Sequence, residues 1–217
     1  MELVATATER TTAATDALLA LAAAAASIFL RRRTAPSFGR SVWQGALGGL
    51  AVASVLGAIA HGVVLPDATR ELLWQPLYLA LGVTMALFVV GAVRDWRGDR
   101  AGRRALLPML ALAAAFYGVT RLTGGDFLAF VVYEAGALVF SLLVYLRLAA
   151  GGRRAGAAEM AAALAVSLGA GALQASEVDS VRLLWEFDHN GLFHLVQLAG
   201  LALMVTGLRR LLAFSTP

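Results

Sequence analysis

Seven long runs of apolar residues, separated by short stretches of charged and turn-forming residues, dominate the sequence. Each run has about 18 to 22 residues, and an α-helix needs roughly 20 residues to cross the hydrocarbon layer of a membrane. The pattern therefore predicts membrane-spanning helices over residues 12–30, 42–65, 72–93, 105–122, 127–148, 157–175 and 189–212. The expected fold class is all-α, with residues 1–217 forming one seven-helix transmembrane bundle.

Composition agrees with this pattern and excludes several kinds of chemistry. Hydrophobic residues make up 59% of the chain and the mean hydropathy is +0.74, which is too apolar for a soluble protein of this length. Cysteine is absent, so disulfides, thiolate metal sites and cysteine nucleophiles are excluded. Lysine is absent as well, which excludes a photoreceptor that holds retinal through a Schiff base.

The distribution of arginine predicts the orientation of the bundle. If the N-terminus lies outside, all of the 18 arginines except Arg10, Arg70, Arg121 and Arg182 fall on the inner side, as the positive-inside rule requires. The sequence pI of about 10.3 could suggest nucleic acid, but these arginines are spread over short loops and form no single basic face. We therefore predict no nucleic-acid partner, a cytoplasmic C-terminus and a location in a plasma membrane, namely the inner membrane of a bacterium.

Polar side chains within the predicted spans gather toward the outer side. His61 lies near the outer end of the second span, and His189, His194 and Gln197 lie at the outer end of the seventh. Other polar groups near the outer ends are Asp16, Gln75, Tyr78, Tyr117, Arg121, Tyr133, Glu134 and Gln174. The inner halves of the spans are almost free of such groups. Because polar groups in a span usually face the bundle interior, the pattern predicts an outward-facing polar pocket.

The three histidines, His61, His189 and His194, make a metal site the leading functional hypothesis. Neutral imidazole is a good zinc ligand, and catalytic zinc commonly has three protein ligands and one open position. His189 and His194 are five residues apart, whereas a regular helix aligns positions three or four apart. Asp188 at an N-cap position would let the His189 ring turn toward His194. Asn190, four residues before His194, would be an alternative ligand or a supporting donor.

Each of these residues also has a simpler interpretation. A histidine near a helix end is often an interfacial hydrogen-bonding residue. Glu134 could be a proton carrier, an acid or base at a metal site, or the ion-pair partner of Arg121. Asp188 and Glu186 could be solvated loop charges, or could orient a histidine. The longer connection between residues 176 and 188 contains Trp185, which is typical of a loop that lies on the membrane interface or caps a cavity.

The seven spans, the outside N-terminus, His61 late in the second span and the segment from Asp188 to Gln197 together resemble the alkaline ceramidase superfamily, which includes the adiponectin and progestin receptors. The resemblance implies a serine four residues before the second-helix histidine, an aspartate early in the third helix and an H-x-x-x-H pair in the seventh. It also implies that the histidines hold zinc and that activated water attacks a lipid amide. His61 and His194 match two of these histidines.

The sequence departs from that pattern in three places. Gly57 stands at the serine position, with Ser54 one turn further back. The third span offers only Asp67 and Glu71, at or before its start. The final pair is His189-x4-His194, or Asn190-x3-His194 if the spacing is kept. The chain would then be a divergent bacterial relative.

Two functions are therefore predicted, and a third is less favoured. The first is a zinc-dependent hydrolase of a lipid amide or ester, with His61, His189 and His194 on Zn²⁺, Glu134 or Asp188 moving the proton, and Asn190, Gln197, Ser54, Tyr133 and Arg121 around them. The alternative is a non-enzymatic heptahelical lipid-binding or sensory protein. A proton-coupled carrier using Glu134 is less favoured because polar groups do not continue to the inner side.

Overall fold

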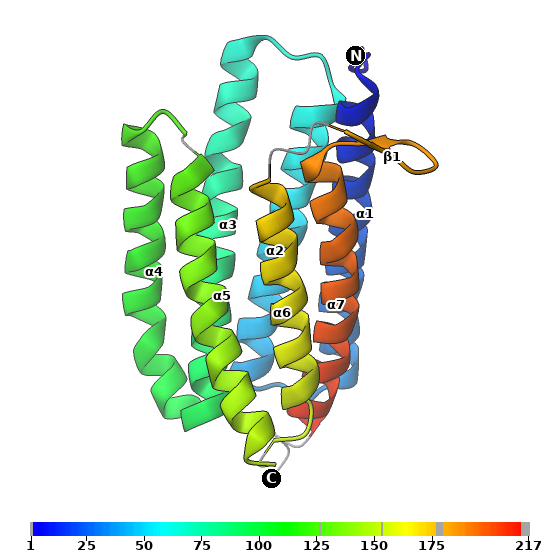
Figure 1. Ribbon diagram of the computed structural model, residues 1–217. Helices are drawn as coiled ribbons and strands as arrows, with labels where there is room; N and C mark the ends of the chain where they lie inside the picture. Colours follow the sequence, from blue (N-terminus) through cyan, green and yellow to red (C-terminus); the bar gives the residue numbers. More distant parts are fainter. Residues whose placement is uncertain (1, 126, 153, 177–179, 214–217) are drawn as a thin grey trace.

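The structure is a computed structural model that describes residues 2–125, 127–152, 154–176 and 180–213. Within these residues the chain forms seven α-helices and one short hairpin (Figure 1). The elements in chain order are α1 (Ala7–Arg33), α2 (Phe38–Gly62), α3 (Asp67–Arg97), α4 (Asp99–Leu122), α5 (Phe127–Ala150), α6 (Ala157–Gln174), β1 (Val181–Arg182), β2 (Glu186–Phe187) and α7 (His189–Ala213).

All seven helices in the described part of the chain are long and apolar enough to cross a membrane, as the apolar runs predicted. The helices differ from the predicted spans mainly at their ends. α1, α3 and α4 continue into charged flanks such as Arg31 to Arg33, because arginine and glutamate are good helix formers whether or not they lie in an apolar layer. α2 ends earlier than predicted, at Gly62. Val63 is extended there, and Val4 N donates to Gly62 O at 3.1 Å.

Six of the helices form a closed ring. Around this ring α1 packs on α2, α2 on α3, α3 on α5, α5 on α6, α6 on α7 and α7 on α1. α4 packs mainly on α3 and touches α5 only lightly, so it stands outside the ring (Figure 1). The short connection from Thr123 to Asp126 predicts that the fourth and fifth helices are close neighbours, but the main neighbours of α5 are α3 and α6. The ring leaves an interior that six helices can line.

A buried polar network lies at the end of the ring where α3 finishes. Arg94 donates to Asp95 Oδ1 at 2.8 Å and to Asp99 Oδ1 at 2.7 Å. The Tyr145 hydroxyl on α5 donates to Asp95 Oδ2 at 2.6 Å, and Asp95 is 1% exposed. The sequence placed Arg94 in a loop and left the inner halves of the helices almost free of polar groups, and this part of the prediction was wrong. The charges are tolerated because each has a partner.

The β1–β2 hairpin lies at the end of the bundle where α7 begins. Its tip carries Leu183, Leu184 and Trp185, which are all exposed, whereas Phe187 is buried. The hairpin extends sideways past α1 (Figure 1), and Thr11 on α1 donates to Glu186 O at 2.6 Å. The sequence predicted that this loop lies on the membrane interface or caps a cavity, and its tip is apolar and exposed beside the bundle.

Candidate functional site

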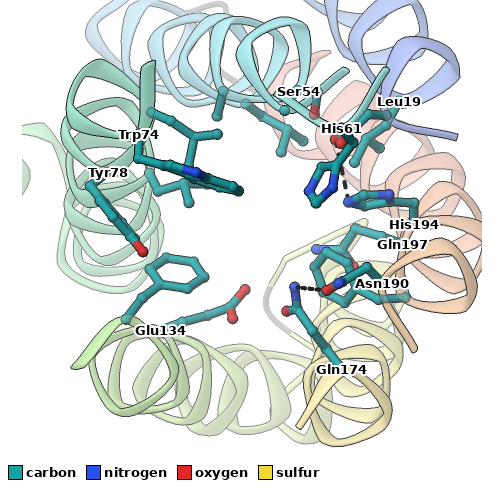
Figure 2. A pocket seen from close by; sticks show the side chains of 18 of the residues that line it. Leu19, Ser54, His61, Trp74, Tyr78, Glu134, Gln174, Asn190, His194 and Gln197 are labelled. Atoms are coloured by element: carbon teal, nitrogen blue, oxygen red, sulfur yellow. Dashed lines mark hydrogen bonds and ion pairs between the residues drawn. The ribbon is translucent and has the colours of Figure 1, made fainter. Parts of the chain in front are cut away.

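A cavity of about 410 Å³ lies inside the ring of helices (Figure 2). All six ring helices contribute to its lining. The lining includes most of the residues that the sequence predicted for the site, namely His61, His189, His194, Glu134, Asn190, Gln197 and Ser54. Apolar side chains such as Leu50, Leu81 and Met85 make up much of the remaining wall. The result is an apolar cavity with a small set of polar groups, which is the usual composition of a small-molecule site.

His61, in the last turn of α2, is oriented by a carboxylate. Its Nδ1 lies 2.8 Å from Glu9 Oε2 on α1, and its ring meets the edge of the Trp74 ring at a centroid distance of 5.7 Å. A carboxylate accepts, so His61 Nδ1 is the donor in this contact. The other ring nitrogen, Nε2, is then an acceptor when the imidazole is neutral.

His194, in the second turn of α7, is oriented by a hydroxyl group. Its Nδ1 lies 3.1 Å from Thr15 Oγ1, and the Thr15 hydroxyl proton is directed at the carbonyl oxygen of Thr12, 2.9 Å away. In the tautomer in which Thr15 accepts from His194 Nδ1–H, Nε2 is the acceptor of the neutral ring. That Nε2 lies 3.3 Å from Asp16 Oδ1. In that tautomer a proton on Asp16 or a metal cation would lie between the two atoms, and in the other tautomer His194 Nε2–H donates to Asp16.

Asp16, in the middle of this arrangement, was not selected as a site residue from the sequence. It is 5% exposed, lines the cavity, and lies on α1 one residue after Thr15. The signal that could have found it is a lone carboxylate inside an otherwise apolar run, since such a residue is functional by default. Sequence spacing could not show it, because α1 and α7 are far apart in the chain.

The opposite wall of the cavity carries a second set of polar groups. Glu134 on α5 is 5% exposed and faces the cavity (Figure 2). Gln174 closes α6, and its Nε2 donates to Asn190 Oδ1 at 3.2 Å. Gln197 Oε1 is buried without a hydrogen-bond partner in the described part of the chain. Hydrogen-bonding capacity therefore remains unused on both sides of the cavity.

Three of the predicted site residues lie elsewhere. Asp188 caps α7, because its Oδ1 accepts from Gly191 N and from Thr12 Oγ1, both at 2.8 Å, and it is not part of the cavity lining. Tyr133 donates to Gly82 O at 3.0 Å and stacks on Phe116, outside this cavity. Arg121 is exposed, and within the described residues it forms no ion pair with Glu134, so that proposed pairing was wrong.

The sequence model of DUF6962, a family of unknown function, matches residues 11–213. The chain belongs to this family. The match covers the helices that line the cavity, so the fold and the cavity belong to the matched region. No curated protein and no solved structure is significantly similar to the chain. The resemblance to the alkaline ceramidase superfamily stays a prediction, because a family of unknown function cannot test it.

The donor chemistry on the α1, α2 and α7 side suits a metal such as zinc, although the donors are not assembled around one point. Two imidazoles offer Nε2 while their Nδ1 atoms are held by Glu9 and Thr15, which is the support that metal-ligating histidines usually have. Asp16 supplies a carboxylate next to His194. Within the described residues, however, no three His, Asp or Glu side chains lie close enough together to hold a metal as they stand.

Proposed function

We propose that this protein is a zinc-dependent membrane hydrolase that cleaves a lipid amide or ester in the cavity. The seven helices would cross a plasma membrane with the N-terminus outside, so that the cavity opens toward the outer leaflet. The arginine distribution supports this orientation, since most arginines would then lie on the cytoplasmic side.

The observation that carries the proposal is the shared orientation of His61 and His194. Each ring has its Nδ1 committed to a residue of α1, Glu9 in one case and Thr15 in the other, and each ring lines the same cavity. Such support fixes the tautomer and the direction of a ligating imidazole. An interfacial histidine that only forms a surface hydrogen bond needs neither a buried hydroxyl nor a carboxylate behind it.

His61, His194 and Asp16 would hold the ion, and His189, the third histidine predicted from the sequence, lines the same cavity. Zinc, when bound, supplies Lewis acidity at a carbonyl oxygen and makes water nucleophilic at neutral pH. The proton released from that water would return to the leaving amine or alcohol. The C–N or C–O bond breaks, and a carboxylic acid and an amine or alcohol leave.

The apolar part of the lining supports a lipid as the substrate. Leu50, Leu81 and Met85 lie toward the middle of their helices, below the histidines, so an acyl chain would occupy the deep part of the cavity. The headgroup bond would then lie at the level of His61 and His194. Burying an acyl chain against these side chains is favourable by roughly 0.8 kcal/mol per methylene relative to water.

The deciding experiment is the metal content of the detergent-purified protein, measured by mass spectrometry after purification without chelators. About one zinc per chain is expected in the wild type, with loss in His61→Ala and in His194→Ala. Hydrolysis of fluorogenic lipid amides and esters should follow the same pattern. Full zinc content in both variants would overturn the assignment of the ligands, and a zinc-free wild type after zinc addition would overturn the hydrolase.

A second function is favoured by one specific observation. Asp16 Oδ1 and His194 Nε2 lie 3.3 Å apart, so a proton shared between them could satisfy both atoms without a metal. Gly57 also stands where the related hydrolases would have a serine. The same cavity would then bind a lipid without cleaving it, as a sensory protein does. A lipid that copurifies intact with metal-free protein is the result expected from this alternative.

A further inference from the structure

Glu134 is a buried carboxylate that the network around the histidines leaves unused. It is 5% exposed, and within the described residues it has neither an ion-pair partner nor a hydrogen-bond donor. Its Oε2 lies against α6, where a Cβ atom on Gly171 would be 3.9 Å away. A charged group in such a position is very unfavourable unless something else compensates its charge.

Gln174, one turn after Gly171 on α6, adds a second unused acceptor. Its amide nitrogen is committed to Asn190 Oδ1, and its Oε1 is buried without a donor in the described part of the chain. Figure 2 shows the side chains of Glu134 and Gln174 reaching into the cavity from neighbouring helices. When Glu134 is ionised, its carboxylate and the Gln174 carbonyl oxygen line this wall, and no described side chain donates to either.

A ligand that satisfies both groups while Glu134 is ionised is a donor that carries positive charge. A neutral alcohol could donate to Gln174, but it would leave the Glu134 charge uncompensated in an apolar cavity. An ammonium group has three donors and one positive charge. Trp74 and Phe130 also line this cavity, and aromatic faces attract organic cations.

We propose that Glu134 and Gln174 form a subsite for the protonated primary amine of an amphipathic ligand. The inference deepens the proposed function and rests on it only in taking the ligand to be a lipid. It names the substrate class as an aliphatic chain with an ammonium group near the polar end. The ammonium would lie against α5 and α6, across the cavity from His61 and His194.

The test is calorimetric titration of the purified full chain, in an uncharged detergent, with tetradecylamine and with tetradecanol. The two probes share the chain and differ in the charged donor. Wild-type protein should bind the amine at least tenfold more tightly than the alcohol. Glu134→Gln, which keeps the shape and removes the charge, should abolish this preference, and Gln174→Leu should weaken it. The control Glu71→Gln, an exposed residue outside the cavity, should retain it.

Three results would overturn the proposal. The first is equal affinity of the wild type for the amine and the alcohol, and the second is an unchanged preference in Glu134→Gln. The third is a heat of binding with sodium chloride alone that disappears in Glu134→Gln, which would assign the subsite to an inorganic cation. His61→Ala separates this inference from the proposed function, because it should lose zinc but keep the preference for the amine.

Discussion

Gly57 on α2 and Asp16 on α1 are in such close contact that no side chain fits between them: a Cβ atom on Gly57 would lie 2.6 Å from Asp16 Oδ2. The missing side chain makes room for the carboxylate that reaches His194 from the other side. Gly57 is also the position at which the resemblance to the alkaline ceramidase superfamily predicts a serine. The polar group at this point of the cavity is therefore supplied by α1 instead of α2.

We expect Gly57→Ala to displace the Asp16 carboxylate and to break its contact with His194. Overpacking of this kind typically costs about 1 to 3 kcal/mol of stability. Gly48→Ala is a matched control on the same helix, because nothing lies within 4 Å of its Cβ position. That control should be neutral or slightly stabilised, since alanine is the better helix former by about 1 kcal/mol. Thermal unfolding in detergent and zinc content would be measured for both variants.

If Gly57→Ala unfolds at the wild-type temperature and retains its zinc, displacement of the Asp16 carboxylate affects neither stability nor zinc binding. The carboxylate would then have no part in the site, and His189 would become the third ligand to test.

The contact between Glu9 and His61 provides the second prediction. Removing a group that orients a metal-ligating histidine typically lowers metal affinity by about 10- to 100-fold. We expect Glu9→Ala to weaken zinc binding by at least tenfold in a competition titration with a chelator. Glu71→Ala removes an exposed carboxylate that is not part of the cavity lining and should leave the affinity unchanged. Equal affinity of Glu9→Ala and the wild type would mean that His61 is not a ligand.

Substitutions of Asp188 can distinguish a structural role of this residue from a catalytic one. Because it caps α7 and accepts from Thr12, we expect Asp188→Ala to lose about 1 kcal/mol or more of stability. Asparagine is an equally good N-cap, so Asp188→Asn should restore most of the stability. Lipid hydrolysis should also be close to normal in Asp188→Asn. A folded Asp188→Asn variant without hydrolytic activity would instead support the carboxylate as the proton carrier predicted from the sequence.

The helices could be predicted from the sequence because each of the seven apolar runs is long enough to cross a membrane as an α-helix. Their ends could not be predicted as well. Residues such as Arg94 and Asp99 follow an apolar run and look like a loop, but Arg94 lies within α3 and Asp99 opens α4. Asp95 is buried beside Arg94, and Tyr145, fifty residues later, supplies a further hydrogen bond. Such a partner is visible only after folding.

In the candidate site, too, the positions of residues within a helix could be predicted from the sequence, whereas their partners on other helices could not. Helical spacing placed His61, His194 and Glu134 near one end of their spans, and all three line the cavity. The role of Asp188 at the start of α7 could be anticipated from its N-cap position. The partners from α1, namely Glu9, Thr15 and Asp16, depend on how the first helix packs between α2 and α7. No spacing rule links Glu9 to His61, 52 positions away, or Thr15 to His194, 179 positions away.

The orientation of the bundle can be tested directly because the chain has no cysteine. Single-cysteine variants carry no background thiol, so each labelling signal reports one position. Ser180→Cys lies just before the β1–β2 hairpin and Ala35→Cys lies between α1 and α2, and both residues are exposed. With the N-terminus outside, a membrane-impermeant maleimide should label Ser180→Cys in intact spheroplasts. Ala35→Cys should react only after the membrane is opened by detergent. The reverse pattern would place the cavity on the cytoplasmic side, and a lipid substrate would then have to enter from the inner leaflet.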